Sequence, residues 1–181
     1  MPSADGFEER KFFGEDDTMR RNKLLRPVPM LAAGLILGTA ARIFDIYCPN
    51  LGEIFSQMAV WILIGTLIAI YSPTKKAAMG NILPFCGGML LTYYATAMLA
   101  HGVYSWSYIL GWTIFALFSP GMAYFAWMSK QRGAFAKCIG AGIVLVSALS
   151  SVLLFDRLRV YDFFIDGLLI YFLFIRKIRR E

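Results

Sequence analysis

Charged side chains within or beside long apolar segments are the residues of this chain that could do chemistry. Carboxylates can bind cations or exchange protons, and a guanidinium can pair with an anionic group. A charge inside a bilayer costs ~2.5–3.5 kcal/mol at the centre, so such residues normally face a partner or a wet cavity. In this sequence they are Arg42, Asp45, Glu53, His101, Asp156, Arg157, Arg159, Asp162 and Asp166.

The first apolar segment places small and charged residues on one side of a helix. At about 100° per residue, an arc of roughly 80° holds Gly34, Gly38, Arg42 and Asp45. Gly34 and Gly38 form a GxxxG stripe, which lets a second helix approach closely. The pattern therefore predicts that Arg42 and Asp45 point into a helix bundle.

The last apolar segment carries a second polar stripe, since Arg159, Asp162 and Asp166 fall within an arc of about 60°. We expect the two stripes to meet, with Arg42 opposite Asp162 or Asp166. The alternative is local neutralisation, because Arg42 with Asp45 and Arg159 with Asp162 are spaced i, i+3.

Six long apolar segments must position these residues. They cover residues 29–47, 54–71, 77–100, 106–128, 134–155 and 160–175. A hydrocarbon core of ~30 Å is crossed by ~20 helical residues, because a helix rises about 1.5 Å per residue. Hydrophobic residues make up 58% of the chain, which would leave a soluble domain with too little polar surface. The sequence predicts an all-α polytopic membrane protein with six transmembrane helices. The predicted parts are a polar tail (1–27), a bundle (28–176) and a basic tail (177–181).

Lysine and arginine lie almost entirely on one side of the predicted membrane. Of the 18 such residues, all but Arg42, Arg157 and Arg159 fall in the tails or in and next to the loops after the second and fourth segments. Positive charge stays cytoplasmic, so we expect both termini in the cytoplasm and the bundle in the plasma membrane. The net charge of +6 is then a topology signal, and it predicts no nucleic-acid partner.

The chain lacks the usual residue sets of metal, cofactor and hydrolase sites. It has one histidine, and its cysteines (Cys48, Cys86 and Cys138) show no CxxC spacing, so we expect no metal, cofactor or disulfide. It also has no GxSxG elbow, HExxH pair or phosphate-binding loop. Pro84 and Pro120 each stand close to glycine at similar depth, where two kinks could form a hinge.

The stretches GLILGTAARIFD, WILIGTLIAI, LLTYYA and ILGW together resemble a family of small, uncharacterised bacterial membrane proteins, known only as a domain of unknown function. The resemblance spans most of residues 30–170, and it implies the six-helix architecture but no activity. In architecture the chain is also similar to the substrate-binding subunits of energy-coupling-factor vitamin transporters. Those subunits have six helices, both termini inside and a ligand site near the outer face. Their first helix carries an Ala-x-x-x-Ala coupling motif, where this chain has Gly34 and Gly38.

Three functions remain open. The first is a transporter-like role, in which a small solute is bound or translocated at an outward-facing polar site lined by arginine, acids and tyrosines. The second is a structural or interaction role, in which the charged residues clamp the first helix to the last. The third is an intramembrane enzyme that uses Asp162 and Asp166. It ranks last of the three, because no nucleophile is identifiable in the sequence.

Expected partners are the lipid bilayer, a small solute, and a membrane protein or a second copy. The predicted ligand-binding residues are Arg42, Asp45, Tyr93, Tyr94, Asp162 and Asp166.

Overall fold

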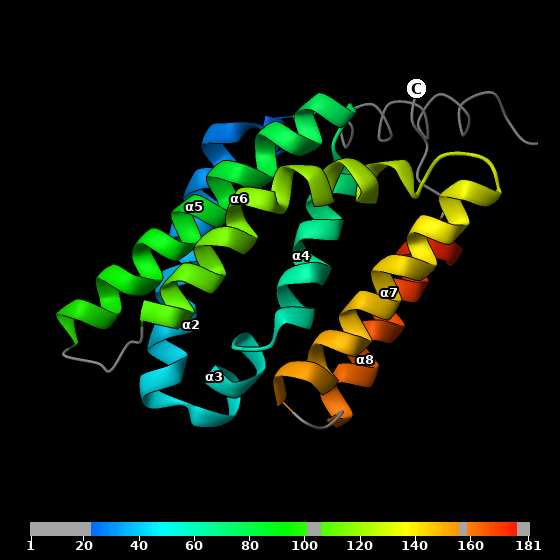
Figure 1. The fold of residues 1–181 in the computed structure, drawn as a ribbon. Coiled ribbons are helices and arrows are strands. Elements are labelled where there is room, and N and C mark those ends of the chain that lie inside the picture. Colours follow the sequence, from blue (N-terminus) through cyan, green and yellow to red (C-terminus); the bar gives the residue numbers. More distant parts are fainter. Residues whose placement is uncertain (1–22, 101–105, 156–158, 177–181) are drawn as a thin grey trace, which may run out of the picture.

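The computed structural model describes residues 23–100, 106–155 and 159–176, and these form helices and connecting turns, with no strand among them (Figure 1). In chain order the elements are α2 (Pro27–Tyr47), α3 (Pro49–Phe55), α4 (Met58–Tyr71), α5 (Lys75–Leu99), α6 (Trp106–Met128), α7 (Ala134–Phe155), α8 (Val160–Ile170) and the π-helical η1 (Tyr171–Ile175). The described part of the chain is therefore all-helical, as predicted.

Most helix ends lie at or near the predicted residues. Helices α6 and α7 begin and end where the apolar segments do. Helix α5 begins two residues earlier than expected, because the Thr74 side chain accepts a hydrogen bond from the Ala77 backbone N–H at 3.1 Å. Such a cap satisfies one of the free N–H groups of the first turn. The helix then continues through Pro84, as α6 does through Pro120.

The second predicted segment, residues 54–71, is not one continuous helix. It is divided between α3 and α4, whose axes differ by 56°. Gln57 has an extended backbone at the break, and the Ser56 hydroxyl donates to the Gly52 carbonyl oxygen at 2.9 Å. The Trp61 indole N–H donates to the Phe55 carbonyl at 2.7 Å, so the break leaves this helix-end carbonyl with a partner.

The last predicted segment is helical over its whole length, but it changes type. The eleven residues of α8 run directly into the five π-helical residues of η1. At about 1.5 Å per residue this rod is roughly 24 Å long, shorter than a hydrocarbon core of ~30 Å.

Four of the described helices, α2, α5, α6 and α7, are long and apolar enough to cross a membrane, and the bent α3–α4 pair would make a fifth span. These are properties of length and composition, and they are consistent with a multi-pass membrane protein. The predicted tails lie largely outside the described residues, so the division at residues 27 and 177 stays a prediction.

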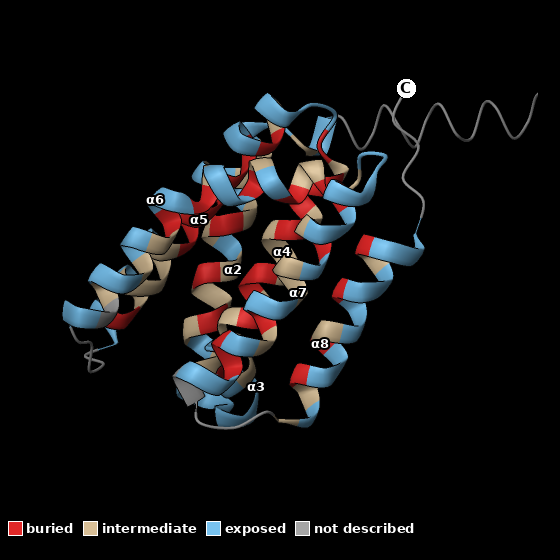
Figure 2. Ribbon diagram, turned by 45° about the vertical axis from the view of Figure 1, so that its right-hand side comes forward, coloured by how far each residue is buried: buried red, intermediate tan, exposed pale blue. Residues whose placement is uncertain are grey.

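Helix α4 lies in the centre, with α2, α5 and α6 on one side and α7 and α8 on the other (Figures 1 and 2). Buried residues face inward on each helix, whereas large apolar side chains such as Ile36, Leu117 and Leu153 are exposed on the outside. An exposed apolar surface of this extent suits contact with lipid rather than water.

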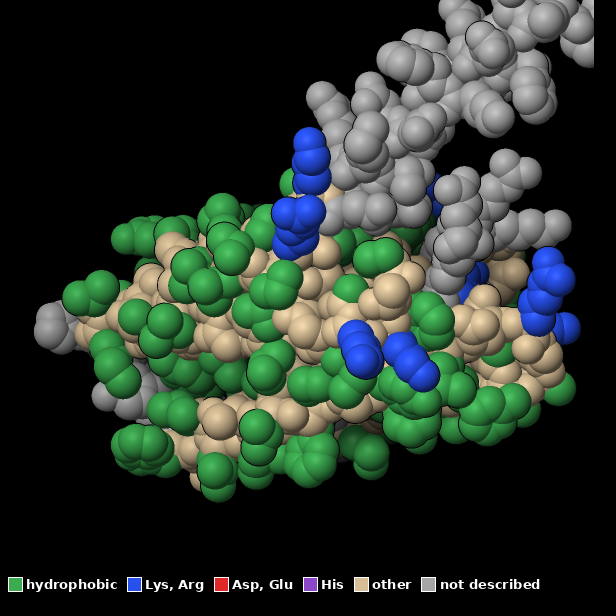
Figure 3. All heavy atoms as spheres, turned by 90° about the horizontal axis from the view of Figure 1, so that it is seen from above, with side chains coloured by type: hydrophobic (Ala, Val, Ile, Leu, Met, Phe, Trp, Pro, Cys, Tyr) green, Lys and Arg blue, Asp and Glu red, His purple; other side chains and the backbone are tan. Residues whose placement is uncertain are grey.

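Charge separates between the two ends of the bundle. Seen from the end at which α5 and α7 begin, the described side chains include lysine and arginine but no aspartate or glutamate (Figure 3). The acidic residues of the described chain lie toward the opposite end, around α3 and the start of α8, and they are Asp45, Glu53, Asp162 and Asp166.

Candidate functional site

The closest helix pair, α2 with α5, sets the position of the first predicted polar residues. A methyl group on Gly34 would overlap the carbonyl oxygen of Phe85, and one on Gly38 would overlap that of Met89. On the facing side, a methyl group on Gly88 would lie 2.8 Å from the Leu31 carbonyl oxygen. Glycine on both helices therefore lets the two backbones touch, which is the packing that a GxxxG stripe permits.

Arg42, Asp45 and Tyr93 form a polar cluster at the end of this pair where α2 ends. The Tyr93 hydroxyl donates to Asp45 Oδ2 at 2.6 Å, and Arg42 Nη1 lies 3.5 Å from the same carboxylate oxygen. The Arg42 guanidinium also lies 5.5 Å from the centre of the Tyr93 ring. The Arg42 and Asp45 side chains are only 13% and 19% exposed, so both charges are largely shielded within the protein. A short hydrogen bond to a carboxylate is among the stronger kinds.

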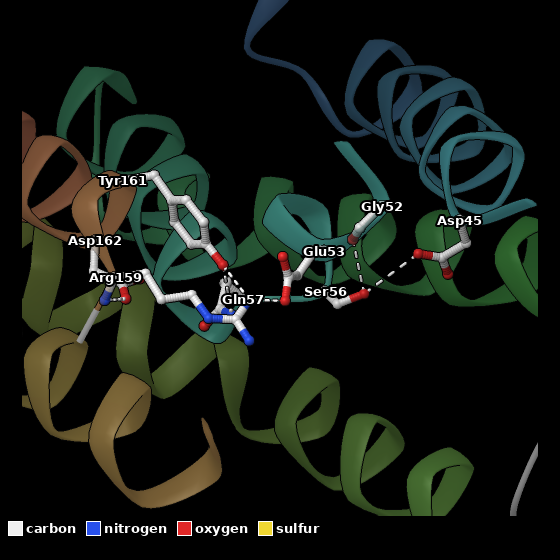
Figure 4. A network of polar contacts seen from close by, with 8 residues as sticks. All are labelled: Asp45, Gly52, Glu53, Ser56, Gln57, Arg159, Tyr161 and Asp162. Atoms are coloured by element: carbon white, nitrogen blue, oxygen red, sulfur yellow. Dashed lines mark hydrogen bonds and ion pairs between the residues drawn. The ribbon is translucent and has the colours of Figure 1, made fainter. Parts of the chain in front are cut away.

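Helix α3 links this cluster to other polar residues at the same end of the bundle (Figure 4). The Ser56 hydroxyl lies 3.4 Å from Asp45 Oδ1. A methyl group on Gly52 would lie 2.6 Å from the Asp45 Cα atom, so α3 folds tightly back against the end of α2. One residue further on, Glu53 forms an ion pair with Arg159, which precedes α8.

The second polar cluster lies where α4, α7 and α8 meet (Figure 4). Arg159 also donates to the Tyr161 hydroxyl, and the Gln57 amide donates to that hydroxyl at 3.4 Å. Asp162 Oδ2 accepts the Arg159 backbone N–H at 2.8 Å, and Asp162 Oδ1 accepts the Ser151 hydroxyl at 3.1 Å. Asp162 is thus a buried cap for the first turn of α8 and a link to α7.

Asp166 lies one helical turn further along α8 and faces Ser147 of α7. Ser147 Oγ and Asp166 Oδ1 are both buried, and neither atom has a hydrogen-bond partner among the described residues. Together with the Ser151–Asp162 bond, these residues place polar side chains over about one turn of the α7–α8 interface.

The two predicted stripes do not meet. Arg42 pairs with Asp45 and Tyr93, whereas Asp162 pairs with Ser151 and the backbone of Arg159. The expected contact of Arg42 with Asp162 or Asp166 is therefore wrong, and the local i, i+3 pairing of Arg42 is what forms. The reason is that the glycine stripe of α2 packs on α5, where Gly88 faces it, and not on α8.

The six predicted ligand-binding residues therefore fall in different places. Tyr94 packs edge-on against Tyr93, with ring centres 5.3 Å apart, but it lines an open apolar groove between α5 and α6. Among the described residues, the two clusters are linked through α3 and the residues after it, by the Glu53–Arg159 ion pair and the Gln57–Tyr161 hydrogen bond. Three other charged or titratable candidates, His101, Asp156 and Arg157, lie outside the described residues.

A cavity of about 290 Å³ lies deeper in the bundle, between α4, α5, α6 and α7. Its floor is formed by buried apolar side chains, among them Trp61, Phe85 and Ala123. Among the residues that the structure describes, no charged side chain lines it, and its polar lining groups are Thr66, Cys86 and Ser119. The Ser119 hydroxyl is satisfied by the Ala116 carbonyl at 2.7 Å.

This cavity is the feature that sequence reasoning missed. Two of its lining residues, Cys86 and Ser119, stand beside the proline–glycine positions of α5 and α6. Proline and glycine weaken close packing within a helix, so their recurrence at one depth was the available signal. Among the described residues, no group of three or more His, Cys, Asp or Glu side chains is placed to hold a metal ion.

Comparison with known proteins identifies the family but no activity. No curated protein and no solved structure matches the chain. One protein family matches residues 17–181, which is most of the chain and includes both polar clusters and every residue that lines the cavity. The chain belongs to this family, which is described as a family of unknown function (DUF6518).

Proposed function

We propose that this protein is an integral membrane protein that binds a small apolar solute inside the bilayer, in the cavity between α4, α5, α6 and α7. The observation that carries the proposal is the cavity itself. Its volume of about 290 Å³ lies near the lower limit of ~300 Å³ for ligand pockets. It also exceeds the ~150 Å³ at which an apolar protein cavity stays dry and takes up benzene.

The lining chemistry favours an apolar ligand over a polar one. A polar solute would need partners for its donors and acceptors, and the cavity offers only Thr66, Ser119 and the Cys86 thiol. The charged residues at the outer end are bonded to one another instead, and they line neither this cavity nor the groove between α5 and α6. The proposed solute site therefore lies at the centre of the bundle and not among the outer charges.

The outer charges support a second, structural role, which the contacts of α3 favour. Asp45 ties α2 to α5 through Tyr93, and Glu53 ties α3 to Arg159 at the start of α8. These bonds join the two sides of the bundle at one end, so they form a clamp between helices. A Glu53→Arg, Arg159→Glu charge swap should then recover the thermal stability that either single change loses. A swap that is no more stable than the single variants would remove this role.

We further propose six crossings, with both termini on the cytoplasmic side of the plasma membrane. The α8–η1 rod would be the sixth crossing and α3–α4 a broken second one. Support comes from the lysine and arginine residues gathered at the end where α5 and α7 begin (Figure 3), because positive charge stays cytoplasmic.

A thermal-shift series on the detergent-purified protein tests the solute site. Small aromatic hydrocarbons, added at rising concentration, should raise the melting temperature of wild type, because a ligand that binds only the folded state stabilises it. Gly142 lines the cavity and has open space where its Cβ would be, so Gly142→Leu should occupy part of the void and weaken the shift. Gly111 is equally open but lies on the exposed face of α6, so Gly111→Leu should retain the shift. Equal shifts in the two variants would place the hydrocarbons elsewhere and refute the proposal.

A further inference from the structure

The cavity opens sideways, toward the surface that faces lipid. Its buried lining residues contrast with three that are exposed: Met122 and Phe125 on α6 are 39% and 52% exposed, and Val146 on α7 is 51% exposed. These three residues mark a mouth between α6 and α7. The two helices diverge from the loop that joins them, and α4 lies between them (Figure 1).

The surroundings of this mouth are apolar on both sides. Phe118 is 67% exposed on α6, and Leu145 and Leu149 are 59% and 45% exposed on α7. The lining residues of α6 and α7 come from the middle and inner half of each helix, between the outer polar clusters and the basic inner end. In a membrane, the molecules present at that depth are acyl chains.

We propose that the resident occupant of the cavity is an acyl chain of a membrane lipid, which enters between α6 and α7. The proposal rests on the proposed function above, because it names the ligand class of the same site. Water is a poor occupant, since it needs two to four polar partners that the lining does not offer. An empty void beside fluid hydrocarbon would forfeit dispersion contacts on all of its walls, and a chain restores them.

Trp61 provides a built-in probe. It lines the floor of the cavity, it is 8% exposed, and its indole N–H is held by the Phe55 carbonyl at 2.7 Å. Bromine quenches indole fluorescence only near contact. Chains in the surrounding bilayer should therefore quench this buried ring weakly, whereas a chain inside the cavity should quench it strongly.

The experiment uses full-length protein in which Trp106, Trp112 and Trp127 are replaced by phenylalanine, so that Trp61 is the only emitter. The protein is reconstituted into phosphatidylcholine vesicles whose chains are brominated near their middle, or into the same vesicles without bromine. We expect brominated chains to lower Trp61 emission at least two-fold. Gly142→Leu should restore most of that emission, and Gly111→Leu should restore none. No quenching, or equal quenching in both leucine variants, would overturn the proposal.

A second measurement covers the case in which the single-tryptophan protein does not fold. Native mass spectrometry of the wild-type protein released from detergent should show one retained phospholipid mass, which Gly142→Leu loses and Gly111→Leu keeps. Retention that is the same in both variants would also overturn the proposal. Hydrocarbon stabilisation that depends on Gly142, without lipid retention or Trp61 quenching, would leave the solute site standing and remove only the acyl chain.

Discussion

Replacing Gly38 with alanine should separate α2 from α5. A methyl group at this position would overlap the Met89 carbonyl oxygen and lie 2.9 Å from the carbonyl carbon. These are backbone atoms of a helix and cannot rotate away, so the helices must move apart. Separation would also weaken the bond from the Thr92 hydroxyl to the Leu35 carbonyl, which is 2.8 Å long.

The expected magnitude follows from three contributions. Overpacking a tight interface costs ~1–3 kcal/mol. An interhelical hydrogen bond in a membrane protein contributes about 0.6 kcal/mol. Alanine is favoured over glycine within a helix by ~0.8–1.0 kcal/mol, which offsets part of the loss. The net loss of unfolding free energy is therefore roughly 1–3 kcal/mol.

Gly87→Ala is the matched control, because Gly87 lies on α5 and has no atom within 4 Å of its would-be Cβ. It should gain helix propensity without a clash. Reversible unfolding by titration of sodium dodecyl sulfate into mixed micelles would measure both free energies. The two variants should differ by about 2–4 kcal/mol in favour of Gly87→Ala. If Gly38→Ala were as stable as the control, the close contact of α2 with α5 would be refuted.

Three further predictions concern polar contacts and topology. Tyr93→Phe should lose ~1.5–3 kcal/mol of unfolding free energy, because it deletes a hydrogen bond to a carboxylate, and clearly less in an Asp45→Asn background. Equal losses in the two backgrounds, measured by a double-mutant cycle, would deny the coupling. Asn81 is 1% exposed and donates to the Leu25 carbonyl at 2.9 Å, so Asn81→Leu should lose ~1–3 kcal/mol in the same titration. Unchanged stability would contradict this. Cys48 and Cys138 are both exposed, near opposite ends of the bundle. A membrane-impermeant maleimide should label Cys48 on intact cells and Cys138 only after permeabilisation, and the reverse pattern would invert the proposed topology.

Local pattern was sufficient for most of the secondary structure. Hydrophobic runs bounded by capping and breaking residues predict α6 and α7 to the residue, and they predict α5 within two. Such signals depend only on neighbours along the chain, which is why they can be read without a fold. The break at Ser56 and Gln57 was missed, because Gln57 is held by the Tyr161 hydroxyl, which lies more than a hundred residues away along the chain.

The sequence by itself also determined that Gly34 and Gly38 form a contact surface and that Arg42 and Asp45 continue it. Only the tertiary structure decided which helix lies against that surface, because the answer depends on where the other helices carry small residues. Gly88 makes α5 the partner, and the charges of α2 and α8 remain in separate clusters. The cavity could be predicted from the sequence even less than the partner of α2. A void is the space that four packed helices fail to fill, and no spacing within one helix can predict its volume or its mouth.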